Sequence, residues 1–225
     1  MEPLKILRYN NSSNRDFTKA LTKRVNSYFK DKKISKFANG KMVFKTTFML
    51  LLYIIPFVLM LINFTDNKWV FFGLEILVGL GMAGIGLSIM HDANHGAYSR
   101  NKKINTLLAN TINLVGGSAL NWRIQHNVLH HSYTNIEGYD EDIQPPPFLR
   151  FSPKSEHRPI HRIQVLYAWL LYGLMTVMWS TTKDITQLIR YNKMELIKTQ
   201  NTTMKKELWK LILSKVIYFI ISLVP

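Results

Sequence analysis

The sequence contains no cysteine. Disulfides, iron–sulfur clusters and thiolate zinc sites are therefore excluded, and any metal site has to be built from His, Asp or Glu. We also expect no cleavable signal peptide, because the first apolar run begins too far from Met1. The first membrane helix would then act as its own signal.

Acidic residues are scarce. The 225 residues include 14 Asp and Glu against 29 Lys and Arg, and 47% of the chain is hydrophobic. Long charge-free runs alternate with basic segments, a pattern typical of a multi-pass membrane protein with basic cytoplasmic loops. A nucleic-acid binder is disfavoured, because the basic residues flank apolar runs and form no recognisable binding module. The length suits one domain.

Residues 1–45 form a basic segment that we expect to be cytoplasmic. Phe17, Leu21 and Val25 recur in it at helical spacing, with lysines between them. This pattern predicts an amphipathic helix. Its apolar face would lie either on an anionic membrane surface or against the rest of a cytoplasmic domain, and the sequence leaves both possibilities open.

Two runs, residues 46–65 and 69–90, are long enough to span a bilayer at about 1.5 Å per residue. They predict a transmembrane hairpin with both outer ends in the cytoplasm, beside the basic N-terminal segment. A Gly-x-Gly-x-x-Gly pattern from Gly79 lies inside the second run, where it lacks the strand and helix of a dinucleotide site. We expect close helix packing there instead, through Gly79, Ala83 and Gly86.

Residues 163–182 are also apolar and about long enough to span. We predict a helix that lies in the membrane interface and covers a metal site. If residues 163–182 crossed the membrane, the basic stretch that follows them would lie outside. Residues 208–225 predict another spanning helix, and the sequence stops within it. We therefore expect residues 46–225 to be an incomplete membrane domain, truncated at its C-terminal end.

Five of the seven histidines fall in two groups, each at the end of an apolar stretch: His91 and His95, then His126, His130 and His131. A spacing of four places His91 with His95, and His126 with His130, on one face of a helix. On an α-helix His131 would lie about 100° further round. Two helices bearing such pairs can close around metal from two sides. A membrane metal transporter is the alternative, but it would carry its ligands along a path inside the spans.

The segments His91-Asp-Ala-Asn-His95 and His126-Asn-Val-Leu-His130-His131 closely resemble the first two histidine boxes of membrane fatty acid desaturases. The likeness is to the acyl-CoA and acyl-lipid branch, which includes linoleoyl-CoA desaturases, and it covers most of the chain from about Trp69. It implies an all-α membrane fold with a cytoplasmic di-iron centre and an O₂-dependent enzyme that introduces a double bond into a fatty acyl lipid or acyl-CoA.

By this resemblance the five histidines match box positions and would be ligands of the two iron ions. The family's third histidine box has no counterpart here, so the chain resembles an N-terminal part that is inactive alone. A related alkyl or lipid hydroxylase is the near alternative. The chain shows no nucleotide site and no His-Pro-Gly-Gly haem segment, so electrons would come from an external carrier of the cytochrome b5 or ferredoxin type.

Two weaker patterns remain. His161 begins a His-x-x-Gln-x-x-Tyr stretch seen in relatives, and we include it among the candidate metal ligands; an ordinary interfacial histidine is the alternative. Asp140, Glu141 and Asp142 could bind metal through carboxylates, but we expect a solvated acidic turn. Asp92, Asn94, Asn127, Asn135 and Asp140 are candidates to orient the imidazole N–H groups.

Overall fold

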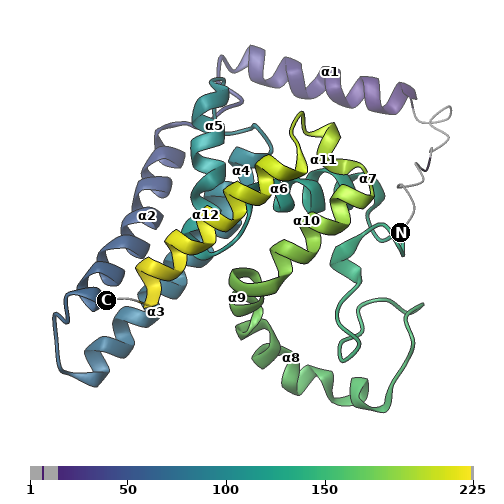
Figure 1. The fold of residues 1–225 in the computed structure, drawn as a ribbon. Coiled ribbons are helices and arrows are strands. Elements are labelled where there is room, and N and C mark those ends of the chain that lie inside the picture. The colour runs from purple at the N-terminus through teal and green to yellow at the C-terminus, as the bar shows by residue number, and fades with distance from the viewer. Residues whose placement is uncertain (1–6, 8–14, 224–225) are drawn as a thin grey trace. The chain divides into compact units, whose positions relative to one another are not determined.

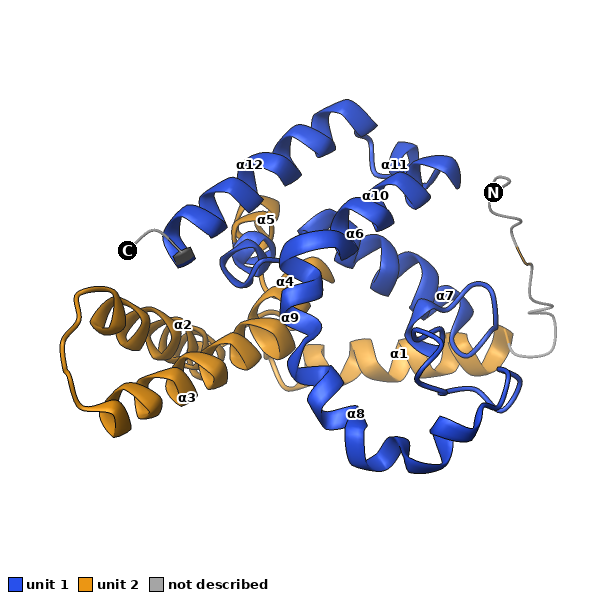
Figure 2. Cartoon of the chain, turned by 60° about the horizontal axis from the view of Figure 1, so that its bottom comes forward, with its two compact units in different colours: residues 1–2, 108–225 blue, residues 3–107 orange. Residues whose placement is uncertain are grey.

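A computed structural model describes residue 7 and residues 15–223 (Figure 1). All regular structure in this part of the chain is helical, which confirms the predicted all-α class. The chain divides into two compact units, residues 3–107 and residues 108–225 with residues 1–2 (Figure 2).

The first unit consists of helices that follow one another closely in sequence. They are α1 (Arg15–Asp31), α2 (Gly40–Leu61), α3 (Lys68–Gly84), the π-helical turn η1 (Ile85–Ile89), α4 (Met90–Asn94) and most of α5 (Lys102–Ala109).

Two helical stretches of the first unit are long and apolar enough to cross a membrane: Gly40–Leu61, and Lys68–Asn94, in which α3, η1 and α4 are continuous. They overlap the two runs predicted as membrane segments, with shifted ends, and that they cross a membrane stays a prediction. The first begins at Gly40 because the side chain of Asn39 accepts a hydrogen bond from the Met42 amide at 3.0 Å. Asn67 caps α3 in the same way, accepting from the Trp69 amide at 3.0 Å.

Two of the residues expected to pack closely, Gly79 and Gly86, do not make the contact between α2 and α3. Gly79 and Gly86 have open space where a Cβ would lie. At Gly81 a Cβ would stand 2.6 Å from the backbone of Tyr53, and at Gly84 it would stand 2.4 Å from Met49 Sδ. The contact therefore runs through Gly81 and Gly84, because α2 lies over that side of α3.

The second unit contains the remaining helical segments of the described chain. They are η2 (Asn110–Val115), α6 (Ala119–Arg123), η3 (Ile124–His130), α7 (His131–Tyr133), η4 (Glu141–Ile143), η5 (Pro159–Ile163), α8 (Gln164–Gly173), α9 (Met175–Met178), η6 (Trp179–Lys183), α10 (Asp184–Lys193), α11 (Leu196–Thr199) and α12 (Met204–Leu223). The segments α6, η3 and α7 form one continuous helical stretch that carries the second histidine group, and α10 packs against α6 and α12.

The predicted interfacial helix over residues 163–182 is not one straight helix. The chain bends by 51° between the stretches Pro159–Gly173 and Met175–Lys193, and only if this bent pair is counted as one span does the chain have a third candidate. The interfacial placement stays a prediction. So does the spanning role of residues 208–225, whose last two residues lie outside the described part of the chain; α12 is not among the candidate spans found in that part.

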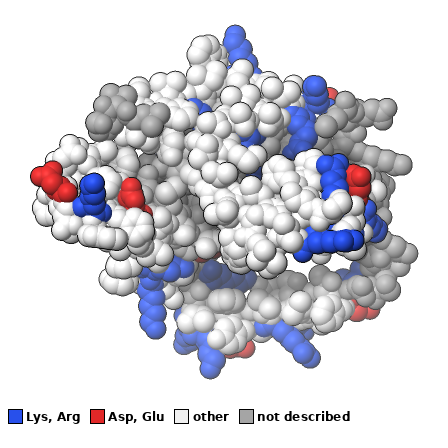
Figure 3. Space-filling view, turned by 90° about the horizontal axis from the view of Figure 1, so that it is seen from below, with Lys and Arg blue, Asp and Glu red and all other residues white. Residues whose placement is uncertain are grey.

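The surface carries many exposed apolar side chains. On α2 and α3 they include Phe44, Leu51, Trp69 and Leu80. Figure 3 shows a face on which Lys, Arg, Asp and Glu are confined to small patches and most of the surface is uncharged. Because soluble proteins rarely expose apolar surface on this scale, the helices require a lipid environment. The chain is thus an integral membrane protein with two to three candidate spans.

Candidate metal centre

The first histidine group lies where the second candidate span ends. His91 belongs to α4 and His95 is its C-terminal cap, and their ring centroids are 4.7 Å apart. Nδ1 of His91 lies 3.2 Å from Oδ1 of Asp92, its neighbour in sequence. His91 is half-buried and His95 is exposed. The two imidazoles are therefore side by side, as their spacing predicts.

Both histidine groups adjoin a π-helical turn. Before the first group, the Met90 amide donates to the carbonyl of Ile85, and in the second the His131 amide donates to the carbonyl of His126. These are bonds between residues five apart, one more than in an α-helix. Such single π-helical turns are uncommon and often mark functional sites.

The π-helical turn changes the direction in which His131 of the second group points. Nε2 of His126 and Nε2 of His131 lie 3.2 Å apart, and the rings of His126 and His130 stack at 5.4 Å. On a regular α-helix His131 would point away from His126. The wider turn brings residues five apart onto one side, so His126 and His131 present their Nε2 atoms to each other.

A buried carboxylate orients His130. Asp140 is completely buried, and its two oxygens lie 3.1 and 3.2 Å from His130 Nδ1. It also accepts hydrogen bonds from the amides of Asn135 at 2.8 Å and Asp142 at 3.0 Å. Burial acts to raise the pKa of Asp140, but these amides and His130 together outweigh it and hold that pKa below its ordinary value. Asp140 is thus ionised and keeps a proton on Nδ1 of His130.

The prediction of a solvated acidic turn was therefore wrong for two of its three residues. Asp140 is buried, and Glu141 is largely buried and forms an ion pair with Arg190. Asp142 remains partly exposed, with Oδ2 3.2 Å from His130 Nδ1. The three possible ligand atoms of His130, Asp140 and Asp142 lie within 4.8 Å of one another. Since both carboxylates face Nδ1, they leave Nε2 of His130 as its outward-facing nitrogen.

His161 is placed differently from the other candidates. It is buried, Nε2 lies 3.0 Å from the carbonyl of Pro147, and Nδ1 accepts from the Arg158 amide at 3.1 Å. One neutral tautomer satisfies both contacts. Neither nitrogen is available to metal in this arrangement, and His161 instead ties the turn before α8 to the preceding loop.

The donor set fits a first-row transition metal such as iron. Imidazole suits iron, copper and zinc, and a neighbouring carboxylate that fixes the ring is a regular feature of metal-binding histidines. The 3.2 Å between Nε2 of His126 and Nε2 of His131 suits two ligands of one ion with bonds of about 2.0–2.1 Å. Histidine spacing thus found these imidazoles, but it gave no sign of Gln125 and Gln187, which contact the acidic turn.

Comparison with known sequences identifies the family. Residues 67–224 match the sequence model of the fatty acid desaturase family. The chain belongs to the fatty acid desaturase family. This desaturase-family chain is 35% identical over 174 residues to the sn-1 linoleoyl-lipid 6-desaturase of Arthrospira platensis. The aligned residues make up 77% of this chain and 47% of the relative.

Two further relatives show the same partial coverage. The enzyme of the same name from Synechocystis is 36% identical, over 73% of this chain and 46% of its own length. An acyl-lipid (8-3)-desaturase of Physcomitrium patens is 33% identical, over 76% of this chain and 36% of its own length. The chain therefore spans less than half the length of these curated relatives. No solved structure matches it.

Proposed function

We propose that the protein carrying this chain is an O₂-dependent desaturase of fatty acyl chains in membrane lipids. The observation that carries the proposal is the pair of histidine groups: in a chain of this family, imidazoles gather at the end of a membrane helix and on a helical stretch with a buried carboxylate behind it. The relatives named above are acyl-lipid desaturases. A lipid-linked acyl chain is accordingly the substrate class we propose, in preference to acyl-CoA.

The metal ligands we propose are His91, His95, His126, His130 and His131. A pair of iron ions bound by them would supply the redox chemistry with which O₂ removes two hydrogens from adjacent methylenes. The electrons would come from a separate protein carrier. Neutral imidazoles leave such a centre electropositive, which suits the binding of O₂.

The protein residues have distinct tasks in this proposal. Asp140 holds the proton of His130 on Nδ1, so that Nε2 carries the lone pair that a metal needs. The π-helical turn keeps His126 and His131 facing each other. Asp92 contacts Nδ1 of His91 in the same way, but both side chains are partly exposed to solvent.

The histidine groups would face the cytoplasm. Lys41 and Lys45 lie at the start of α2, while the loop between α2 and α3 is short. Because basic residues stay on the cytoplasmic side, α2 would run outward and the stretch from Lys68 would return to place His91 at the inner surface. A metal transporter is disfavoured, since its ligands would lie within the spans.

Helix α1 would lie on the inner membrane surface. None of its residues is buried, and Phe17, Leu21, Val25 and Tyr28 are 70, 49, 45 and 55% exposed. These four lie on one side of the helix and form a stripe that stays exposed in the described structure. A basic helix with an exposed apolar stripe, close to a membrane span, suits an anionic lipid surface.

Product analysis tests the function. The full-length protein is produced in membranes of a host that makes linoleoyl lipids, and the fatty acids are analysed as methyl esters by gas chromatography and mass spectrometry. We expect a new acid two mass units lighter than its precursor, and bound iron in the purified protein. A product sixteen units heavier would show a hydroxylase instead. Zinc uptake into vesicles without any new acid would favour the transporter.

Because these 225 residues contain no cysteine, single cysteines introduced into them test the orientation. Single Cys residues are introduced at Asn63, between α2 and α3, and at Ser99, after the first histidine group. In intact cells an impermeant maleimide should label Asn63→Cys, whereas Ser99→Cys should react only after the membrane is opened. Labelling of Ser99→Cys in intact cells would place the histidines outside and contradict the proposed topology.

A further inference from the structure

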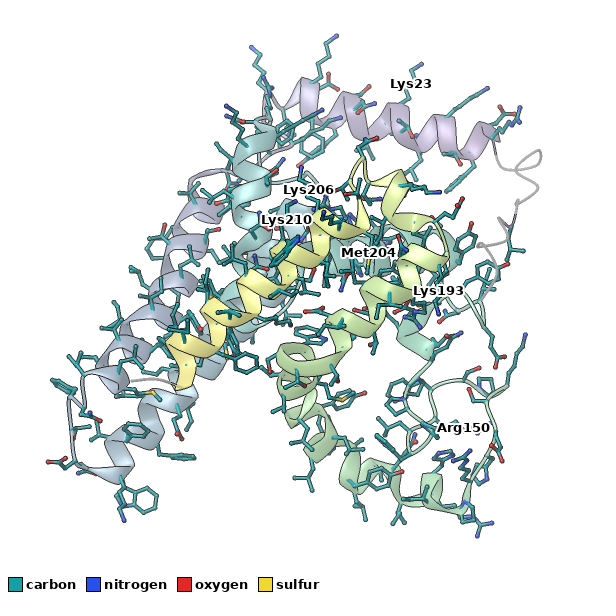
Figure 4. All side chains as sticks on the ribbon, in the orientation of Figure 1. Lys23, Arg150, Lys193, Met204, Lys206 and Lys210 are labelled. Atoms are coloured by element: carbon teal, nitrogen blue, oxygen red, sulfur yellow. The ribbon has the colours of Figure 1, made fainter. Side chains whose placement is uncertain are left out.

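Helix α10 carries three polar residues on one face. Asp184, Gln187 and Arg190 are three residues apart, so they line one side of the helix. Asp184 and Gln187 are 4% and 5% exposed, which is unusual for residues of these types. In Figure 4 the labelled Lys193 marks the end of α10, and Lys206 and Lys210 mark the first turns of α12. Buried polar groups need partners, and all three of these residues find them in other segments of the same unit.

The first of the three ties two helices together. Asp184 Oδ2 accepts from Nζ of Lys215 at 2.6 Å, and that ammonium also donates to the carbonyls of Gly116, at 2.6 Å, and Trp179. The side chain of Asn121 donates to the carbonyl of Asp184 at 2.7 Å. Lys215 belongs to α12 and Asn121 to α6, the start of the stretch that carries the second histidine group. Asp184 therefore fixes the base of that stretch.

The second residue, Gln187, is linked to His130 through two intermediate residues, Gln125 and Asp142. The amide nitrogen of Gln187 donates to Gln125 Oε1 at 2.7 Å and to Glu141 Oε2 at 3.0 Å. Gln125 in turn donates to Asp142 Oδ1 at 2.7 Å. The other oxygen of Asp142, Oδ2, lies 3.2 Å from Nδ1 of His130. Both N–H donors of the Gln187 amide are used, so its orientation is fixed.

The third residue completes the support of the acidic turn. Arg190 forms an ion pair with Glu141, the same carboxylate that accepts from Gln187. Glu141 is thereby held between two donors of α10. The turn that contains Asp140 and Asp142 is fixed to α10 at this point.

We propose that α10 is the positioning element of the second histidine group, and that Gln187 is a positioning residue which holds His130 through Gln125 and Asp142. This inference rests on the proposed function for its purpose, since it assigns Gln187 the task of keeping a metal-ligand imidazole in place. Loss of the Gln187 amide releases Gln125 and Glu141 together. Gln125, which donates to Asp142, is then no longer held by α10, so the oxygen of Asp142 that contacts His130 is less firmly placed.

The test uses the full-length protein with ¹⁵N-labelled histidine, in the metal-free and iron-loaded states. The ¹⁵N signals of His130, assigned by their loss in His130→Gln, report the proton and hydrogen bonding at Nδ1. In the metal-free protein we expect Gln187→Met to shift these signals. Iron affinity, measured by competition with a chelator, should fall by about three- to tenfold, less than the ten- to hundredfold typical of removing a direct partner of a ligand.

Two further variants make the result specific. Gln125→Met breaks the same chain of contacts one step closer to His130 without removing a group from α10, so it should give the same shift even if Gln187→Met fails to fold. The double variant should lose little more affinity than either single one, because both break one pathway. Gln144→Met, an exposed glutamine just after the turn, is the control and should change neither measurement.

The possible outcomes separate the inference from the function on which it rests. Unchanged His130 signals in both Gln187→Met and Gln125→Met would overturn the positioning role, even if the protein binds iron and makes product. A shift in both variants, in a protein that binds no iron, would support the positioning role and refute the proposed metal centre.

Discussion

The two histidine groups are built in different ways. His91 and His95 continue a membrane helix, and their position depends on the close packing of α2 against Gly81 and Gly84. His126, His130 and His131 lie on a helical stretch whose outer side is held by buried polar groups, Asp140 above all. The first group is thus placed by backbone shape and the second by hydrogen bonds. Substitutions should therefore affect the two groups through different properties of the protein.

The largest effect should come from removing a ligand, and it should be equal in the two groups. His91→Gln and His130→Gln should each lower product formation by about a hundredfold or more, since even the loss of a residue that only supports a ligand costs ten- to hundredfold. Product is measured by mass spectrometry and iron by elemental analysis. His157→Gln, at an exposed histidine, is the control. An active His91→Gln protein would remove the first group from the proposed centre.

Next in size is the loss of the buried carboxylate of the second group. Asp140→Ala leaves the amides of Asn135 and Asp142 without their acceptor and leaves His130 Nδ1 only the partly exposed Asp142, so iron affinity should fall by about ten- to hundredfold. The conservative Asp140→Asn retains an acceptor oxygen, so its iron affinity should lie between that of Asp140→Ala and that of the wild type. Equal iron affinity in all three proteins, measured by chelator competition, would show that His130 does not depend on Asp140.

The first group should respond instead to packing. Gly81→Ala forces a methyl group against the backbone of Tyr53, where the gap is 2.6 Å, and overpacking of this kind costs about 1–3 kcal/mol. Unfolding by sodium dodecyl sulfate, followed by circular dichroism in lipid–detergent mixtures, measures the loss. Gly79→Ala meets open space and should be tolerated. If both variants were equally stable, α2 and α3 would not be held at Gly81.

The smallest effect should come from the carboxylate of the first group. Asp92 touches His91 from the next position in sequence and is partly exposed, so Asp92→Ala should lower iron affinity by no more than about threefold, well below the range for a buried partner. Chelator competition compares it directly with Asp140→Ala. An equal loss in the two variants would end the distinction between a group placed by backbone and a group placed by hydrogen bonds.

Much of this organisation could be predicted from the sequence. The apolar runs indicated the two long apolar helices that the structure contains, and the histidine motifs indicated the family that the comparison confirms. The pairing of His91 with His95 follows from helical spacing alone. The prediction of a solvated turn at Asp140 was wrong, because acidic residues in a short polar segment carry no sign of the amides and imidazole that surround them. Gly81 and Gly84, which contact α2, were not among the residues expected to pack closely, since hydropathy does not show which side of an apolar helix faces a neighbour.

The sequence by itself determined the residue types available to a metal, the helical class and the need for a membrane, because composition and spacing act locally along the chain. Tertiary structure decided the rest. Asn121 meets Asp184 across 63 positions, and Gln125 meets Gln187 across 62. The π-helical turn η3 directs His131 toward His126. Such contacts depend on the direction of individual hydrogen bonds between distant segments, and the pattern of apolar and polar residues does not encode that direction.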